Sequence, residues 1–230
     1  FNAETTADEV LEDLDLGDKV VLITGASSGL GAESARAMAA KGAIVVVTAR
    51  QIDKARGVAE EIRGETGNAD VYVMALELTD LASVRAFAAA FLERHGHLDV
   101  LINNAGVMAC PLTRTAAGYE LQFATNHLGH FLLGELLLPA LRAGAPSRIV
   151  AVSSAGHRLS PVLFDDIHFH STAYDKWTAY GQSKTANVLH AVELDRRLRG
   201  DGVRALAIHP GAIVTELGRY LQVDDLTALN

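Results

Sequence analysis

Short apolar runs alternate with longer stretches of helical periodicity from Lys19 onward. The runs are rich in Val and Ile with few polar interruptions, which is typical of strands buried on both faces of a parallel sheet. They lie at residues 20–24, 44–48, 71–76, 100–102, 148–152 and 204–208. The helical stretches lie at residues 31–41, 53–65, 83–95, 116–141 and 179–198. This alternation predicts an α/β fold, a doubly wound parallel sheet between two layers of helices.

Two segments interrupt this alternation. Residues 1–16 form a short acidic extension in which Thr6 and Glu9 have the spacing of a capping box. Residues 155–178 form a long insertion, and loops of that length commonly shape a binding pocket. Since no repeat or low-complexity linker divides the remainder, we predict a single domain over residues 17–230.

Composition and charge restrict the class of protein. The chain has 230 residues, 49% hydrophobic and 21% charged, an ordinary balance for one soluble domain. Its formal net charge of −8 argues against nucleic acid or an anionic membrane as partner. A single cysteine, Cys110, excludes an internal disulfide and fits a reducing compartment. With no basic and apolar leader at the start, we expect a cytoplasmic protein.

A glycine-rich turn follows the first predicted strand and opens the first predicted helix. It reads Thr24-Gly25-Ala26-Ser27-Ser28-Gly29-Leu30-Gly31. In a dinucleotide-binding turn, Gly25 would allow the tight bend, Gly29 the approach of a pyrophosphate, and Gly31 close packing of helix on strand. The helix N-terminus would then offer unpaired N–H groups to the phosphates. The alternative is a glycine-rich turn without a ligand.

The end of the second predicted strand indicates which dinucleotide is preferred. NAD-selective sites commonly have a carboxylate there that holds the ribose hydroxyls. This chain has Arg50 and no acid, so a guanidinium is available for a 2′-phosphate. We therefore predict NADP(H) rather than NAD(H) as cofactor. The alternative is that Arg50 is a solvated charge at a helix start.

Tyr180 and Lys184 lie four residues apart on one face of a predicted helix. A nearby ammonium favours the phenolate, so we expect the pKa of Tyr180 to lie below its ordinary value of about 10. Such a tyrosine exchanges a proton with an alcohol near neutral pH. By itself the spacing also fits a tyrosine packed over a lysine stem.

Taken together, these motifs resemble the short-chain dehydrogenase/reductase family, over residues 17–218. The matching motifs are the Thr24–Gly31 turn, Asn103-Asn104-Ala105-Gly106, Asn126, Ser154, the Tyr180–Lys184 pair, Pro210-Gly211 and Thr215. The blocks at 6–11, 16–19, 122–131 and 152–158 are similar to the branch of retinol dehydrogenases and the WW-domain oxidoreductase. The resemblance implies a Rossmann-type fold and hydride transfer between a nicotinamide and a carbonyl or alcohol carbon.

The resemblance also implies a role for each matching residue. The catalytic set would be Tyr180 as general acid/base, Lys184 as its partner and ribose ligand, Ser154 as donor to the substrate oxygen, and Asn126 as holder of a relay water. The expected cofactor-binding set is Gly25, Ser27, Ser28, Gly29, Leu30, Gly31, Arg50, Glu77, Leu78, Asn104, Ala105, Gly106, Tyr180, Lys184, Pro210, Gly211 and Thr215. Ser154 as a strand-end cap and Asn126 as a buried structural amide remain alternatives.

The chain departs from the family pattern in two places. Glu77 stands where the family has an Asp that holds the adenine amino group. The family pattern continues with a further helix and a seventh strand, and we expect both to be absent from residues 17–230.

Apolar residues near the expected pocket favour an apolar aldehyde, ketone or alcohol as substrate. These residues are Val107, Met108, Leu159 and Trp177, and the alternative is that they belong to the ordinary core. Two other functions stay open: reduction of a carbon–carbon double bond, as in the more distantly similar protochlorophyllide reductases, and non-catalytic NADP sensing. His127 and His130 lack a matched ligand set, so we expect no metal. Family relatives often pair through the helices at 116–141 and 179–198, which implies a homodimer or homotetramer. The alternative is that the apolar faces of these helices pack only within the subunit.

Overall fold

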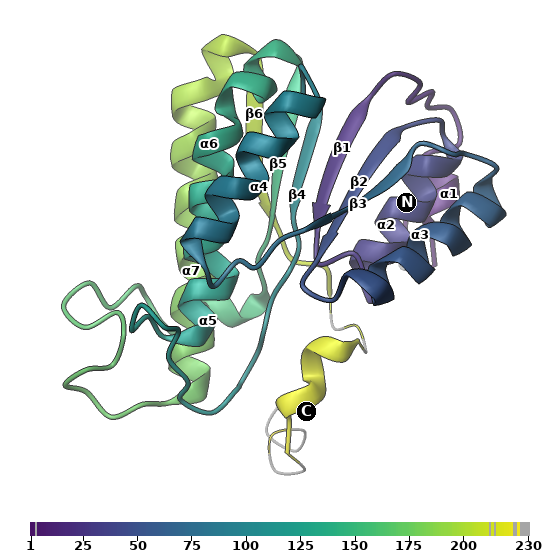
Figure 1. Ribbon diagram of the computed structural model, residues 1–230. Helices are drawn as coiled ribbons and strands as arrows, with labels where there is room; N and C mark the ends of the chain where they lie inside the picture. Colours follow the sequence, from purple (N-terminus) through teal and green to yellow (C-terminus); the bar gives the residue numbers. More distant parts are fainter. Residues whose placement is uncertain (3, 212, 214, 223–224, 226–230) are drawn as a thin grey trace.

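One parallel sheet organises the molecule (Figure 1). The computed structural model describes residues 1–2, 4–211, 213, 215–222 and 225. Within these residues six strands lie in the order β3-β2-β1-β4-β5-β6, and every adjacent pair is parallel. The strands are β1 (Val20–Thr24), β2 (Ile44–Ala49), β3 (Val71–Ala75), β4 (Val100–Asn103), β5 (Ser147–Val152) and β6 (Val203–Ile208). The chain reverses its direction of progress between β1 and β4, where doubly wound sheets bind their ligands. The predicted fold class is confirmed.

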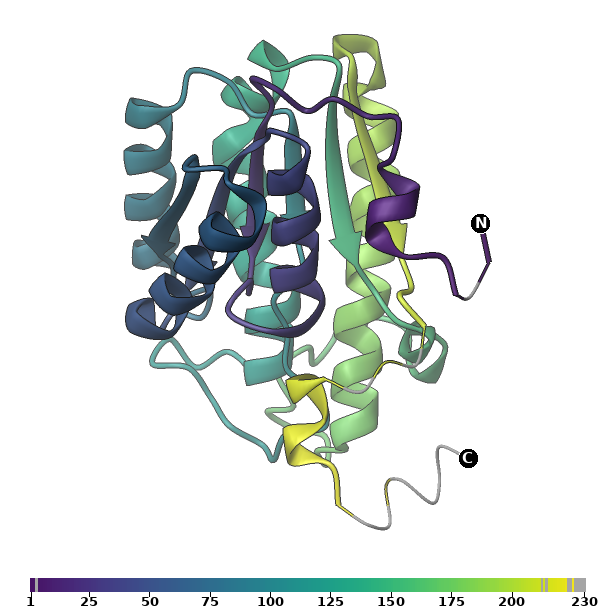
Figure 2. The ribbon, with the colours of Figure 1, turned by 90° about the vertical axis from the view of Figure 1, so that its right-hand side faces the viewer.

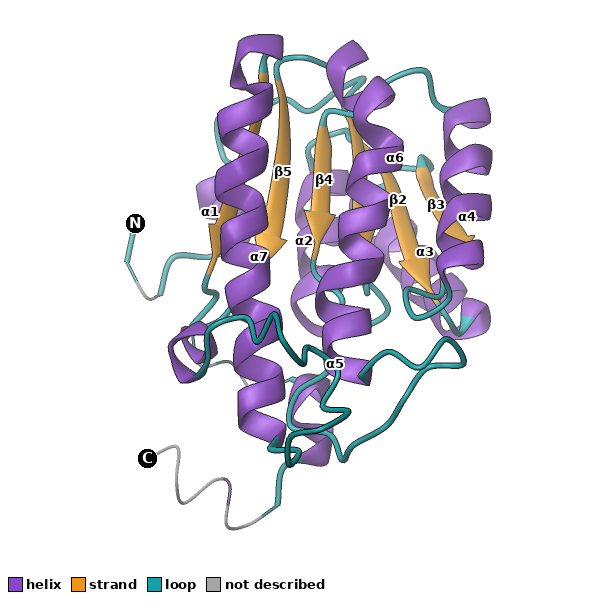
Figure 3. Ribbon diagram, turned by 90° about the vertical axis from the view of Figure 1, so that its left-hand side faces the viewer, coloured by secondary structure: helices purple, strands orange, loops and turns teal. Residues whose placement is uncertain are grey.

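Helices cover both faces of this sheet. The α-helices are α1 (Ala7–Val10), α2 (Gly29–Ala40), α3 (Ile52–Thr66), α4 (Leu81–Arg94), α5 (Leu121–Phe123), α6 (Gly129–Ala143) and α7 (Lys176–Leu198). Figure 3 shows α4, α6 and α7 over one face, and Figure 2 shows α2 and α3 on the other. A π-helical turn, η1 (Ala124–Leu128), joins α5 to α6, and 3-10 turns lie at η2 (Ala155–Leu159), η3 (Arg199–Asp201) and η4 (Glu216–Tyr220).

Each helical layer has its own apolar core against the sheet. Under α4, α6 and α7 the core includes Leu22, Phe91 and Leu133. Under α2 and α3 it includes Ile23 and Val45 with small alanines, which let these helices approach the strands closely. The alternation of side chains along each strand supplies both cores, which is why the strands are apolar throughout.

The N-terminal extension docks on α2. Thr6 and Glu9 form the expected capping box at the start of α1. The Arg36 guanidinium of α2 then pairs with the Asp8 carboxylate at 3.0 Å.

The largest difference from the predicted elements concerns the stretch 116–141. Helical structure begins only at Leu121, because Glu120 accepts hydrogen bonds from the backbone N–H groups of Gln122 and Phe123. Residues 116–119 are not helical, and Arg114 and Glu120 form an isolated antiparallel bridge. The helix over 179–198 starts three residues earlier than predicted, at Lys176, where Asp175 caps it.

Candidate active site

The glycine turn between β1 and α2 packs tightly against the loop after β4. Gly25 has φ of +66°, and a Cβ there would lie 2.7 Å from the Ala105 Cα. A Cβ on Gly31 would lie 2.6 Å from the Asn104 Nδ2. Both positions therefore exclude any larger residue. Gly29 also has a positive φ, +57°, and is exposed at the start of α2.

Asn104 fastens these two loops together. Its Nδ2 donates to the carbonyls of Thr24 at 2.8 Å and Gly25 at 3.1 Å. The backbone N–H groups of Asn104 and Ala105 both donate to the Thr24 Oγ1, at 2.9 and 3.0 Å. The glycine turn and the loop after β4 are thus joined directly in the structure.

The first turn of α2, like that of α3, has no side-chain cap. Ser28 at its N-cap makes no side-chain hydrogen bond to the helix backbone, whereas Asp80 and Asp175 cap α4 and α7. Since the first N–H groups of a helix attract anions, α2 offers a phosphate-binding end. Ser27, Ser28 and Leu30 are half-buried around this end.

The residues expected at the adenosine end lie near one another. Arg50 is exposed just after β2, and its Nε lies 3.8 Å from the Glu77 Oε2. The other Glu77 oxygen accepts from the backbone N–H and the hydroxyl of Thr79, at 2.9 and 2.6 Å. Leu78 is buried, and a Cβ on Gly129 would lie 2.4 Å from its carbonyl oxygen. The pairing of Arg50 with Glu77 was not foreseen.

Tyr180 and Lys184 lie on α7 and are both buried. The Lys184 Nζ donates to the Val152 carbonyl at 2.9 Å and lies 5.6 Å from the centroid of the Tyr180 ring. Burial lowers the pKa of Lys184 to about 8. Burial raises the pKa of Tyr180, and its hydrogen bond with Ser154 opposes that rise. The expectation of a lowered Tyr180 pKa is therefore wrong for this structure, because desolvation of the phenol is the largest effect.

Asn126 lies in the π-helical turn with its side chain fully buried. Its Oδ1 accepts from the Val107 N–H at 2.8 Å, and its Nδ2 donates to the Val107 carbonyl and the Ser183 Oγ, each at 2.9 Å. A Cβ on Gly106 would lie 3.2 Å from the Asn126 Oδ1 and 3.7 Å from the Lys184 Nζ. Gly106 therefore keeps space open between the asparagine and the lysine.

The segment after β6 reaches back over the glycine turn. Pro210 and Gly211 follow β6, and Thr215 caps η4 through its hydroxyl. The Thr215 Cγ2 would lie 3.4 Å from a Cβ on Gly29. Figure 2 shows this segment below the carboxyl ends of the strands.

The first residue of η4 bridges that segment to the glycine turn. The Glu216 carboxylate pairs with the Lys54 Nζ of α3 at 3.0 Å and accepts from the Ser28 Oγ at 3.4 Å. Sequence reasoning missed Lys54 and Glu216, since nothing in their spacing indicates that they meet.

The residues near the expected substrate pocket differ in their contacts and in their burial. Trp177 forms an edge-to-face pair with Tyr180, with 6.5 Å between ring centroids. His157 lies beside Ser154, its Nδ1 2.7 Å from the Ser154 carbonyl oxygen. Val107 is buried, whereas Leu159 is 54% exposed.

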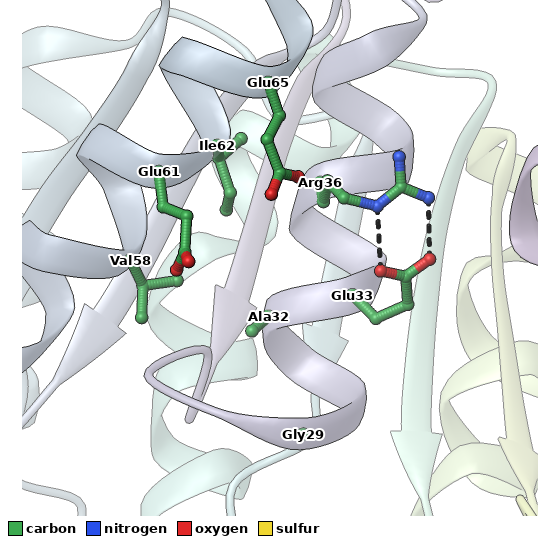
Figure 4. A pocket seen from close by; sticks show the side chains of 8 residues that line it. All are labelled: Gly29, Ala32, Glu33, Arg36, Val58, Glu61, Ile62 and Glu65. Atoms are coloured by element: carbon green, nitrogen blue, oxygen red, sulfur yellow. Dashed lines mark hydrogen bonds and ion pairs between the residues drawn. The ribbon is translucent and has the colours of Figure 1, made fainter.

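A separate groove lies between α2 and α3 (Figure 4). Its lining carries more carboxylates than cations and consists of Gly29, Ala32, Glu33, Arg36, Val58, Glu61, Ile62 and Glu65. Because Arg36 is already paired with Glu33 at 2.7 Å, the groove offers little to a phosphate. The candidate site is therefore the region around Tyr180 and the glycine turn.

Comparison with known proteins decides the family. A family model described as short chain dehydrogenase matches residues 19–164. The chain belongs to the short-chain dehydrogenase family. This confirms the resemblance inferred from the motifs, including its retinol dehydrogenase branch.

The curated relatives include retinol dehydrogenases. Retinol dehydrogenase 11 of Mus musculus is 47% identical over 212 residues, which cover 90% of this chain and 66% of the mouse protein. The Homo sapiens protein of the same name is 49% identical over 209 residues, covering 89% of this chain and 64% of its own. This chain thus spans about two thirds of the length of these relatives.

Solved structures show the same fold. A crystal structure of a protein from Mycobacterium paratuberculosis superposes with a TM-score of 0.80 at 44% identity, covering 94% of this chain and 75% of that one. A metagenomic short-chain oxidoreductase in complex with NADP gives a TM-score of 0.70 at 31% identity, covering 93% and 90%.

Across the residues that the structure describes, no helix combines the length and apolar character needed to cross a membrane. Nor do His, Cys, Asp and Glu side chains from the described parts of the chain gather in a group of three or more that could hold a metal ion.

Proposed function

We propose that this member of the short-chain dehydrogenase family is an NADP(H)-dependent oxidoreductase that interconverts an apolar alcohol and its aldehyde or ketone. The observation that carries the proposal is the grouping of the half-buried Ser154 with the buried Tyr180 and Lys184 beside the glycine turn, where the sheet changes direction. The names of the retinol dehydrogenase relatives support an apolar alcohol or aldehyde as substrate.

The residues at the glycine turn fit a dinucleotide. The tight contacts of Gly25 and Gly31 shape a close approach of backbone, and the first turn of α2 lacks a side-chain cap. We propose that these N–H groups hold the pyrophosphate, and that the exposed Arg50 binds the 2′-phosphate. Glu77 and Leu78 would lie at the adenine, and Thr215 at the nicotinamide.

The nicotinamide of NADP(H), when bound, supplies or accepts the hydride. Tyr180 gives its hydroxyl proton to the substrate oxygen in reduction and takes it back in oxidation. Because burial raises the pKa of Tyr180, its hydroxyl is protonated at neutral pH and suited to the donor role. Ser154 donates a hydrogen bond to the same oxygen and stabilises charge that develops there.

Lys184 and Asn126 act behind the tyrosine in this proposal. Among the described residues the Lys184 Nζ donates only to the Val152 carbonyl, and its other donors would bind the ribose hydroxyls. The nearby Asn126 Oδ1 and Gly106 border the space through which a proton would pass from Lys184 to solvent.

Binding and turnover together test the proposal. Fluorescence titration of the purified chain with NADPH should show tighter binding than with NADH, and a panel of apolar aldehydes should be reduced in the presence of NADPH. Equal affinity for the two cofactors would contradict the role of Arg50 in binding the 2′-phosphate. It would leave the proposed oxidoreductase function unaffected. Binding without turnover on any aldehyde or ketone would favour the NADP sensor, and turnover of conjugated alkenes alone would favour a double-bond reductase.

Association of copies and location in the cell stay predictions. Exposed apolar side chains lie on α6 and α7, namely Phe131 at 43%, Leu189 at 52% and Val192 at 64%. We propose that they form the homodimer or homotetramer interface, with no nucleic-acid or membrane partner. Sedimentation of a Leu189→Asp, Val192→Asp variant should show a smaller species than the parent chain. The cytoplasmic location is tested by imaging a tagged chain.

A further inference from the structure

His130 connects the catalytic helix to the cofactor loops from inside the core. It lies in the first turn of α6 and is 3% exposed. Its Nδ1 lies 3.0 Å from the backbone oxygen of Asn126, and its Nε2 lies 2.8 Å from the Thr24 Oγ1. One imidazole therefore spans the end of β1 and the turn that holds Asn126.

The partners of the ring fix its tautomer. A carbonyl oxygen only accepts, so the Nδ1 must carry the proton that is shared with Asn126. Burial among Lys184, His127 and His190 lowers the pKa of His130 to about 4, so the ring is neutral and its Nε2 is an acceptor. The Thr24 hydroxyl then donates to this Nε2 at 2.8 Å in preference to its other acceptor, the Ile102 carbonyl oxygen, which lies farther away at 3.4 Å.

The chain of hydrogen bonds continues beyond Thr24. With its proton directed to His130, the Thr24 Oγ1 accepts from the backbone N–H groups of Asn104 and Ala105. Donation thus runs in one direction, from the Asn104–Ala105 loop through Thr24 and His130 to Asn126. Each polar atom in the series has a partner, which is the condition under which a buried network rigidifies a site.

The hydrogen bond between His130 and Asn126 falls on a π-helical turn. The Gly129 N–H bonds to the Ala124 carbonyl five residues back, so the helix is locally wide. A wide turn admits alternative arrangements of its carbonyls and side chains. In the structure the His130 ring bonds to the Asn126 carbonyl, and the Asn126 side chain meets Val107 and Ser183.

We propose that His130 is a positioning residue that fixes Asn126 relative to the glycine turn and the Asn104–Ala105 loop. The inference rests on the proposed oxidoreductase function, because its consequence is the placement of Asn126 and Lys184 against the cofactor. The hydrogen bonds of the neutral Nδ1–H imidazole act on the Asn126 backbone, and they add to those that the Asn126 side chain makes with Val107 and Ser183.

The first test determines the tautomer of His130 and does not depend on catalytic activity. Nitrogen NMR of the histidine-labelled chain should show His130 with a protonated Nδ1 and a bare Nε2, unchanged between about pH 5.5 and 9. Thr24→Val should shift the Nε2 resonance from its position in the parent. Thr24→Ser, which keeps the hydroxyl, should show the resonance at the parent's position. A His130 with a protonated Nε2, or one that Thr24→Val does not affect, would overturn the proposal.

The second test reads catalysis. His130→Leu and Thr24→Val should each lower kcat by about tenfold to thirtyfold with little change in the aldehyde KM, and the loss in the double variant should be smaller than the product of the two single losses. The matched control is His95→Leu, which removes a partly buried imidazole elsewhere in the fold, one whose Nε2 has no partner among the described residues. Its kcat should equal that of the parent.

The outcomes separate this inference from the proposed function. If the parent protein reduces no carbonyl compound with NADPH, the proposed function is contradicted. The NMR result then still shows whether the hydrogen bonds from Thr24 through His130 to Asn126 are present. An active parent whose kcat is unaffected by Thr24→Val contradicts the inference alone. If His130→Leu fails to fold, the nearly isosteric Thr24→Val and Thr24→Ser pair decides it.

Discussion

The Glu216 carboxylate lies 3.0 Å from the Lys54 Nζ, so the segment after β6 is joined to α3 directly beside the glycine turn. The same carboxylate accepts from the Ser28 Oγ, and the Lys54 ammonium lowers the pKa of Glu216. A cofactor phosphate that approaches the start of α2 would therefore meet a negative charge and a lysine that is already paired. This relationship suggests that Glu216 weakens anion binding at the turn.

Glu216→Gln should tighten NADPH binding, because it removes a like charge and frees Lys54 for a phosphate. Exposed ion pairs contribute up to about 1 kcal/mol, so we expect at most about a fivefold lower Kd in fluorescence titration. The matched control is Glu193→Gln. Glu193 is also an ion-paired carboxylate, but it lies on α7, where it pairs with Arg196 and Arg197. Unchanged or weaker binding in Glu216→Gln would show that Glu216 instead supports the site.

Arg50→Gln should reduce the preference for NADPH over NADH. A hydrogen bond to a charged group is worth about 1.5–3 kcal/mol, so the NADPH Kd should rise by roughly 10- to 100-fold. The NADH Kd should change little, because that cofactor has no 2′-phosphate. A matched loss of affinity for both cofactors would mean that Arg50 acts through the loop rather than through the phosphate.

The apolar strands were predictable because burial on both faces demands continuous Val and Ile, and their bounds agree with the structure to within one residue. The helix over 116–141 was not, since a capping glutamate and a π-helical turn override the apolar periodicity there. The motifs also indicated which residues gather at Tyr180. The Lys54–Glu216 pair and the Thr24–His130 contact depend on residues 162 and 106 positions apart, which no local pattern reports.

Two glycine substitutions should have opposite effects on stability. Gly31→Ala would place a Cβ 2.6 Å from the Asn104 Nδ2 and the Gly25 carbonyl oxygen, so it should cost about 1–3 kcal/mol. Gly57→Ala in α3 meets nothing within 4 Å and should stabilise the chain by about 0.5–1 kcal/mol through helix propensity. Urea denaturation measures both, and a neutral Gly31→Ala would contradict the tight packing of turn against loop.

Stability should depend on pH through Lys184. Its pKa is about 8 in the folded chain and, for an ordinary lysine, about 10.4 in the unfolded one. Between these values the unfolded chain binds the extra proton, so this group makes the free energy of unfolding rise with pH. Below pH 8 the cost of burying the ammonium is fully present.

Lys184→Met isolates this contribution from that of other titrating groups. The stability advantage of Lys184→Met over the parent should shrink as pH increases from about 8 to 10, in urea denaturation at matched ionic strength. Parallel pH profiles for the two chains would show that Lys184 titrates at its ordinary pKa and is not desolvated as the structure indicates.

The most direct test of the central claim is turnover of an apolar aldehyde such as retinaldehyde with NADPH by the parent chain and by Tyr180→Phe. Phenylalanine keeps the ring contacts of Tyr180 and removes only its hydroxyl. We predict that the parent reduces the aldehyde and that Tyr180→Phe loses about two to four orders of magnitude in kcat with an unchanged NADPH Kd. A Tyr180→Phe variant that retains the parent's kcat would contradict the assignment of Tyr180 as the proton donor and, with it, the proposed reaction.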